Sequence, residues 1–170
     1  SLPLNENIKV SIQEENISFT VNNDTVVKSR LIDAKYVQYN LVIPNSNDFV
    51  LLISKDELLS SLKRVNQFAN KADNFVLLSI SNNQLTLTSS DDVKGKSTEV
   101  VNCVYLNDPM RIGFNSDYLM SVISRIETEE VKVLLKGDRY PGLFMSSEVT
   151  EGDYSNLMLV MPCYLPEKMN

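Results

Sequence analysis

Four basic residues recur at helical spacing, and they are the side chains with the clearest capacity for binding. Lys63 and Arg64 lie on the polar face of a helix that we expect after Ser54, Lys71 follows that helix, and Arg125 occupies the matching place on a second expected helix. If the helices lie side by side, these cations share one surface. A few such charges give weak, salt-sensitive, sequence-independent contact with phosphates. Ordinary solvated helix faces explain the spacing equally well, so both interpretations stay open.

The second candidate is an apolar stretch near the carboxyl end of the sequence. Residues 157–160 have the composition of a buried strand, and Met161-Pro162-Cys163-Tyr164-Leu165 follow directly. We expect the later residues to lie past the last strand pairing, where adaptable apolar side chains can line a groove for a partner segment.

The residues of common catalytic sites are missing or badly placed. The chain has no histidine and only five glycines, and it contains no glycine-rich phosphate loop. The absence of histidine removes the commonest general base and most zinc sites. The acidic pairs Asp91-Asp92 and Glu129-Glu130 lie in polar turns, where solvated loop charge is the simpler interpretation. The sequence therefore predicts a protein without enzymatic activity, cofactor or metal.

Composition sets the protein class. With 170 residues, 43% of them hydrophobic, the chain is long enough for one folded domain or slightly more. Sixteen Lys and Arg against 22 Asp and Glu give a net charge of −6, which excludes a generally basic surface but not a local basic face. No apolar run is long enough to span a membrane and no export signal is recognisable. We expect a cytoplasmic protein in which Cys103 and Cys163 are buried free thiols.

The middle of the sequence alternates strands and a helix. Residues 49–53 form an apolar strand that runs into a helix, whose start is marked by the Ser-x-x-Glu pattern of a capping box at Ser54 and Glu57. Strands are expected at residues 75–80, 84–88 and 99–105. The unit reads β-α-β-β-β.

The same order then repeats. A strand at residues 110–114 leads into a helix capped by Asn115 or Ser116, and strands follow at 131–135, 142–146 and 157–161. At an offset of 61 the two helices align as Asp56 with Asp117, Leu58 with Leu119, Ser60 with Ser121, Leu62 with Ile123, Arg64 with Arg125 and Val65 with Ile126. Such matches indicate a duplication. We predict an α+β fold for residues 49–170, with two helices on one face of antiparallel sheets.

The first 48 residues form only part of another copy. Short alternating strands are expected at residues 7–12, 16–21 and 25–31, with no opening strand or helix before them. We expect residues 1–48 to be the carboxyl-terminal part of a preceding domain, and the natural protein to continue upstream.

In this order and spacing, the segments resemble the bacterial DNA polymerase III beta subunits, the sliding clamps, from the latter part of the middle domain to the end. The resemblance rests on residues 29–39 (SRLIDAKYVQY) with Val42-Ile43-Pro44, on Asn83-Gln84-Leu85-Thr86-Leu87, on residues 112–119 (IGFNSDYL), and on Leu159-Val160-Met161-Pro162. It implies the DNA-clamp fold and a homodimeric ring around double-stranded DNA. It also implies a non-catalytic processivity factor for the replicative polymerase.

The resemblance also implies partners and their sites. A cleft between the middle and last domains would bind short peptides from the polymerase catalytic subunit, the clamp loader, other DNA polymerases and repair proteins. The matching residues are Val37, Leu41, Val42, Asn115, Tyr118, Leu159, Met161, Pro162, Cys163, Tyr164 and Leu165. Gln67, Phe68, Glu99 and Val101 would form the dimer interface, and Lys63, Arg64, Lys71 and Arg125 would face DNA.

The sequence departs from the family pattern at three places. Tyr36-Val37-Gln38-Tyr39 stands where the family usually has Phe-Pro-Asp-Tyr, and Leu41 stands where an arginine is common. Residues 166–170 extend past the usual end near Leu165. The alternative to a clamp is a β-rich structural or adhesive module, which explains the strands and acidic charge but not the two matched helices.

Overall fold

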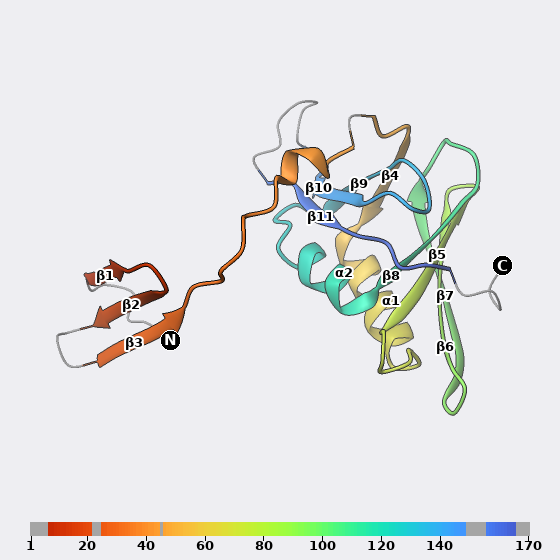
Figure 1. Ribbon diagram of the computed structural model, residues 1–170. Coiled ribbons are helices and arrows are strands. Elements are labelled where there is room, and N and C mark those ends of the chain that lie inside the picture. Colours follow the sequence, from red (N-terminus) through yellow and green to blue (C-terminus); the bar gives the residue numbers. More distant parts are fainter. Residues whose placement is uncertain (1–6, 22–24, 45, 149–155, 166–170) are drawn as a thin grey trace. The chain divides into compact units, whose positions relative to one another are not determined.

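The computed structural model describes residues 7–21, 25–44, 46–148 and 156–165. Contacts within the chain divide it into two units, residues 1–38 and 39–170 (Figure 1). This division falls ten residues before the domain boundary expected at residue 48. Residues 39–48, including a short 3-10 helix at Tyr39–Leu41, therefore group with the second unit.

The first unit is a three-stranded antiparallel sheet of β1 (Ile8–Ile12), β2 (Asn16–Val21) and β3 (Thr25–Arg30). Val10, Phe19 and Val27 lie opposite one another across the strands. Since side chains alternate between faces, this face also carries the other apolar residues of β1 and β2 at two-residue spacing. Val10 is 52% exposed and Val27 49% exposed. The three expected strands are present, and one face of their sheet is apolar and partly open.

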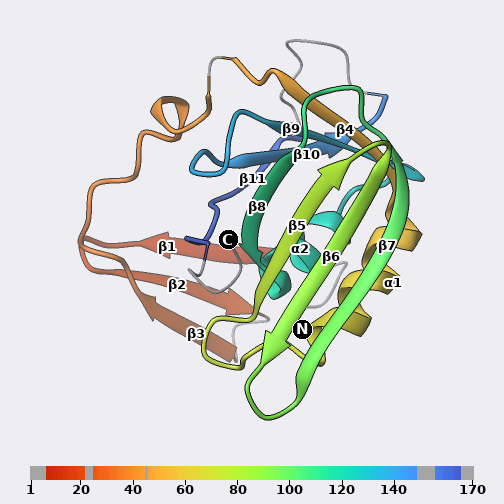
Figure 2. The same cartoon turned by 90° about the vertical axis from the view of Figure 1, so that its right-hand side faces the viewer.

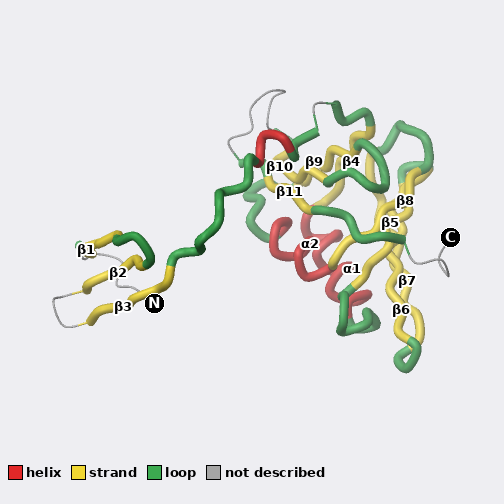
Figure 3. Tube along the Cα trace, viewed as in Figure 1, coloured by secondary structure: helices red, strands yellow, loops and turns green. Residues whose placement is uncertain are grey.

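The second unit contains the two copies of β-α-β-β-β that the sequence predicts (Figure 3). The elements of the first copy are β4 (Phe49–Ser54), α1 (Lys55–Asn66), β5 (Phe75–Ser81), β6 (Gln84–Asp91) and β7 (Gly95–Val104). Those of the second are β8 (Met110–Asn115), α2 (Ser116–Ile123), β9 (Glu130–Leu135), β10 (Gly142–Ser146) and β11 (Met158–Val160).

The two copies are interlocked through one eight-stranded sheet, in the order β11-β10-β9-β4-β7-β6-β5-β8. The first strand of each copy pairs with the strand that follows the helix of the other copy: β4 with β9, and β8 with β5. Figure 2 shows β5 to β8 side by side with α1 behind them. Neither copy is a separate domain, because each completes the sheet of the other.

A single bridge after β11 repeats a pairing of the first copy. In the first copy β4 pairs with β7 at Leu52 and Val104. In the second copy Gly113 of β8 forms an isolated antiparallel bridge with Cys163. The strand registers make Gly113 the counterpart of Leu52 and Cys163 the counterpart of Val104. The bridge thus joins the two ends of the strand order, and it fixes the chain beyond β11 against β8.

The two helices pack side by side and run in opposite directions. At the end of α1, Asn66 donates to the Asp117 carboxylate at 3.1 Å. At its start, Lys55 Nζ donates to the carbonyl of Ile126 at 2.6 Å. Each helix is capped at its amino end, α1 by Ser54 and α2 by Asn115. The predicted choice between Asn115 and Ser116 is thereby settled, because the Asn115 side chain accepts from two backbone amides of the first turn.

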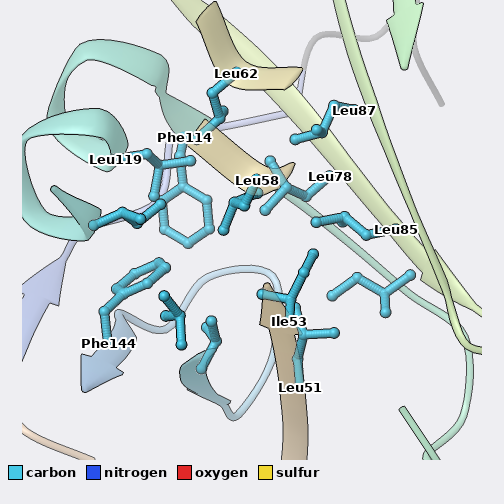
Figure 4. Close-up of a cluster of buried hydrophobic side chains, with 14 of the residues drawn as sticks. Leu51, Ile53, Leu58, Leu62, Leu78, Leu85, Leu87, Phe114, Leu119 and Phe144 are labelled. Carbon is cyan, nitrogen blue, oxygen red and sulfur yellow. The ribbon is translucent and has the colours of Figure 1, made fainter. Parts of the chain in front are cut away.

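The core lies between the helix pair and the sheet. Figure 4 shows Leu58 and Leu62 of α1 and Leu119 of α2 pointing toward side chains of the strands. Phe114 and Phe144, one from each half of the sheet, meet edge to face with ring centroids 6.0 Å apart. The aligned pairs Leu58 with Leu119, Leu62 with Ile123 and Val65 with Ile126 are all buried, as the duplication predicts.

The structure corrects several expected boundaries. Arg125 and Ile126, which the alignment of the two copies places in the second helix, follow α2 in turns, and Phe68 follows α1. Strand β7 begins at Gly95, four residues earlier than predicted, since it pairs with β6 down to the hairpin turn. The two cysteines are free but only half-buried.

Replacing Gly113 by alanine should destabilise the second unit. An added Cβ would lie 2.4 Å from the Phe75 ring and 3.3 Å from the Cys163 carbonyl oxygen. Overpacking of this kind costs about 1–3 kcal/mol. Urea denaturation of Gly113→Ala measures this loss. The matched control is Gly137→Ala, whose Cβ would meet the Tyr140 ring at an ordinary 3.4 Å; equal stability of the two variants would contradict the close packing at Gly113.

Candidate functional site

One pocket of the second unit is lined by the residues that follow β11. Met161, Pro162, Cys163, Tyr164 and Leu165 form one side, and Asp138 and Arg139 complete the lining of a space of about 350 Å³. Five of the predicted peptide-binding residues therefore share one pocket. We call it the terminal pocket.

The strand register explains why Asp138 and Arg139 lie there. Gly142 at the start of β10 pairs with Val160 at the end of β11. The antiparallel chain beyond Val160 must then run past the loop that precedes Gly142. In that loop the Tyr140 amide donates to the Gly137 carbonyl at 3.2 Å, which closes a turn with Asp138 and Arg139 at its corner. No local pattern in the sequence marks these two residues, because their place depends on the strand register.

The bridge to β8 holds the terminal segment in place. The Cys163 amide donates to the Gly113 carbonyl at 2.8 Å. Met161 remains 56% exposed and Tyr164 88% exposed, so side chains on either side of the bridge are open to a ligand. Burial raises the pKa of the Cys163 thiol, and the charge of Asp73 raises it further. The thiol is therefore a neutral, weakly polar part of the lining at neutral pH.

The other predicted peptide contacts fall outside the lining of the terminal pocket. Asn115 is committed to capping: its oxygen accepts from Asp117 and Tyr118, and its amide donates to the Asp73 carbonyl at 2.7 Å. Tyr118 is 65% exposed in the first turn of α2, and Leu41 is 80% exposed. Leu159 lies within β11 and Val42 is half-buried, while Val37 belongs to the first unit.

A second surface lies along β7 and α1. Residues 95–102 of β7 pair with β6, and β4 pairs only with Cys103 and Val104, so the described strands leave this edge without a partner on its second side. A shallow groove of about 380 Å³ runs beside it, lined by Asp56, Glu57, Ser60, Ser61, Arg64, Val100 and Val101. We call this surface the β7 edge. An open strand edge of this length is a template for pairing with another chain.

Within the described residues, an ion pair joins α1 to β7 at this surface. Arg64 Nη2 of α1 lies 2.8 Å from Glu99 Oε2 of β7, and it also donates to the Ser61 hydroxyl at 3.0 Å. The Arg64 hydrogen bond lowers the pKa of the Glu99 carboxyl, and the same bond raises the pKa of Arg64. The pair is solvent-exposed, so it orients the two side chains more than it stabilises the fold.

The predicted interface residues differ in how they are presented. Gln67 and Phe68 follow α1, and Phe68 is 36% exposed. Val101 does not fit the expected outward position: its side chain is 4% exposed and belongs to the core, whereas Val100 is 56% exposed. Strand alternation places neighbouring residues on opposite faces, so Val100 presents its side chain outward and Val101 does not.

The four basic residues do not form one cluster. Lys63, Lys71 and Arg125 are exposed, and Arg64 is exposed but paired with Glu99. Because the helices are antiparallel, Arg64 near the end of α1 and Arg125 after α2 lie toward opposite ends of the helix pair. Asp56, Glu57 and Asp117 occupy the first turns of the same helices. The helix pair therefore carries mixed charge.

No three His, Cys, Asp or Glu side chains among the described residues are grouped to hold a metal ion. Within the same part of the chain, neither helix has the length and apolar character needed to cross a bilayer.

Comparison with known proteins decides the family. The family described as DNA polymerase III beta subunit, C-terminal domain, matches residues 40–162. The chain belongs to this family. The expected resemblance is confirmed, and the matched range begins close to the division between the two units.

Curated relatives carry one name. A beta sliding clamp from Proteus mirabilis is 30% identical over 112 residues, which cover 66% of this chain and 30% of the relative. A beta sliding clamp from Rickettsia felis is 26% identical over 168 residues, covering 94% of this chain and 43% of the relative. The chain thus spans less than half the length of these curated relatives.

Solved structures confirm the clamp fold. The sliding clamp of Bartonella birtlesii, determined bound to griselimycin, is 26% identical with a TM-score of 0.76, and the match covers 93% of this chain and 41% of that one. A sliding clamp from Pseudomonas aeruginosa, 23% identical, gives the same TM-score over 95% of this chain and 43% of its own length. The predicted α+β clamp fold with a duplicated unit is therefore confirmed.

Removing the Arg64 guanidinium should raise the pKa of Glu99 toward its ordinary value. The hydrogen bond lowers that pKa, so the pair favours the folded state above the ordinary titration range of glutamate and this contribution is lost as pH falls through the lowered value. Carboxyl carbon shifts of Glu99, followed by NMR against pH in Arg64→Ala, measure the change. Lys63→Ala is the control, and an unchanged Glu99 pKa in Arg64→Ala would show that the pair is not formed in solution.

Proposed function

We propose that this chain is the last domain, with the end of the preceding one, of a bacterial sliding clamp. The complete protein then encircles double-stranded DNA as a homodimeric ring in the cytoplasm and tethers the replicative polymerase, with no reaction of its own. The observation that carries the proposal is the match of residues 40–162 to the beta subunit family. The duplicated unit with two adjacent helices agrees with it, whereas a β-rich adhesive module would account for neither.

The first unit is, in this proposal, the end of the middle domain. Its sheet has an apolar face with Val10 about half exposed, and such a face needs a second layer to cover it. The Bartonella birtlesii match covers 93% of this chain, a larger share than residues 39–170 supply. We propose that another part of the clamp covers this face.

The terminal pocket is proposed as the site for short peptides of polymerases, the clamp loader and repair proteins. Met161, Pro162 and Leu165 offer apolar surface, and burying a few such anchors gives small interfaces most of their affinity. Tyr118, Leu159, Leu41, Val42 and Val37 stay proposals for contacts of a longer peptide beyond the pocket. Asn115 is proposed to act through its backbone position, since capping occupies its side chain.

The β7 edge is proposed as the contact with the partner subunit. The unpaired side of residues 95–102 can extend a sheet across two subunits, with Val100 and Phe68 adding apolar contact. Gln67 is proposed as a further contact, and Glu99 with Arg64 forms the polar rim of this surface. Val101 contributes its backbone while its side chain remains in the core.

The helix pair is proposed to face DNA through Lys63, Lys71 and Arg125, with Arg64 contributing less because Glu99 balances its charge. The mixed charge of the helices suits a ring that moves along DNA, since a few phosphate contacts give weak and salt-sensitive attraction.

A titration of the isotope-labelled chain with griselimycin tests the pocket. Because a related clamp was solved with this compound, we expect amide shifts concentrated at residues 161–165 and at Asp138 and Arg139. Met161→Ala should weaken binding by about fivefold or more, as the loss of an apolar anchor does. The matched control is Val93→Ala, which removes an exposed apolar side chain from the β6–β7 turn. Shifts centred elsewhere, or equal affinity for Met161→Ala and wild type, would refute the assigned site.

A further inference from the structure

We propose that the turn at Asp138 and Arg139 gives the terminal pocket a charge preference, for peptides that carry a carboxylate next to their apolar anchor. This inference rests on the proposed function, because it concerns which peptides the same pocket accepts. Arg139 is the recognising group and Asp138 limits the number of negative charges that the pocket tolerates.

The geometry separates an apolar wall from a charged one. Met161, Pro162 and Leu165 come from the segment after β11, whereas Asp138 and Arg139 come from the corner of the turn before β10. A peptide whose apolar side chains lie on the first wall must present its neighbouring residues to the second. One wall can therefore bind the apolar side chains of a short peptide while the other selects for the charge of the neighbouring residues.

The charges of this turn are free to act on a ligand. Neither Asp138 nor Arg139 forms an ion pair with another residue in the described ranges, and both are exposed. The nearest cation in sequence, Lys136, lies over the Tyr140 ring with Nζ 5.1 Å from its centroid, a position that holds it by a cation–π contact. Arg139 is then the cation of this loop that faces the pocket.

The sign of the preference follows from the groups present. The loop from Lys136 to Gly142 carries two cations and one acid, so it is locally positive on a chain of net charge −6. A guanidinium is permanently charged and offers paired donors that fit the two oxygens of a carboxylate. A peptide with one carboxylate gains this contact with Arg139, whereas a second carboxylate on the peptide is repelled by the negative charge of Asp138. A basic peptide is attracted by Asp138 but repelled by the net positive charge of the loop.

Two sources can supply the carboxylate: an Asp or Glu side chain, or the free carboxyl terminus of the peptide. Both present the same planar pair of oxygens to Arg139. Two separate test peptides, one with an acidic side chain and one with a free carboxyl terminus, therefore distinguish the two sources.

The test measures affinities of short peptides that share the same two large apolar anchor residues. One is neutral with an amidated end, one adds a glutamate and keeps the amidated end, one is neutral with a free carboxylate, and one replaces the glutamate by lysine. We expect wild type to bind at least one carboxylate peptide about three- to tenfold more tightly than the neutral one, with a difference that shrinks at high salt. Binding of both carboxylate peptides, or of either one, supports the proposal and identifies the source.

Charge reversal assigns the preference to its residue. In Arg139→Glu the carboxylate advantage should disappear, the neutral peptide should bind as before, and the lysine peptide should gain affinity. Lys96→Glu makes the same charge change on β7 outside the pocket lining and should keep the wild-type order. If Arg139→Glu retains the preference, or weakens all peptides equally, the proposal is wrong. If wild type binds the neutral peptide without any preference, only the charge inference fails; if it binds none of them, the peptide-binding function fails as well.

Discussion

The hydrogen bond from the Cys163 amide to the Gly113 carbonyl is the contact on which the functional surface depends. It holds the chain beyond β11 against β8, so that this segment forms one side of the terminal pocket. It also connects β8 to the segment after β11, the strands at opposite ends of the eight-stranded sheet. The contact requires a glycine, because the Phe75 ring occupies the place where a Cβ would stand. The packing of Phe75 and the bridge that holds residues 161–165 against β8 therefore meet at Gly113.

Duplication supplied two equivalent segments, and they serve different purposes. In the first copy the segment through Val104 belongs to the long strand β7, which leaves residues 95–102 as an open edge beside α1. In the second copy the paired strand is short, and the segment through Cys163 crosses β8 with side chains exposed on both sides. The same β-α-β-β-β plan thus yields an open strand edge in one copy and the terminal pocket in the other, the two surfaces that we propose for a partner subunit and for a peptide.

Much of the fold could be predicted from the sequence because its signals are local. The capping pattern at Ser54 and the apolar periods at Leu58 and Leu119 mark the helices, and the offset of 61 reveals the repeat. The pairing register of distant strands cannot be predicted from local sequence patterns, so the position of Asp138 and Arg139 beside residues 161–165 was not predicted. The burial of the Val101 side chain was missed for the same reason, since a shift of one residue along a strand decides which side chain is buried. The peptide, dimer and DNA assignments came from the family resemblance and remain proposals.

Hydrogen exchange at the Cys163 amide, measured by NMR, tests most directly whether residues 161–165 are held against β8. If the bridge to Gly113 persists in solution, this amide exchanges far more slowly than an unprotected one, and at a rate closer to that of core strand amides such as Val133. Its neighbour Tyr164, for which the structure gives no backbone partner among the described residues, should exchange quickly. Fast exchange at both positions would mean that residues 161–165 are not held against β8, and the account of the pocket would fail with them.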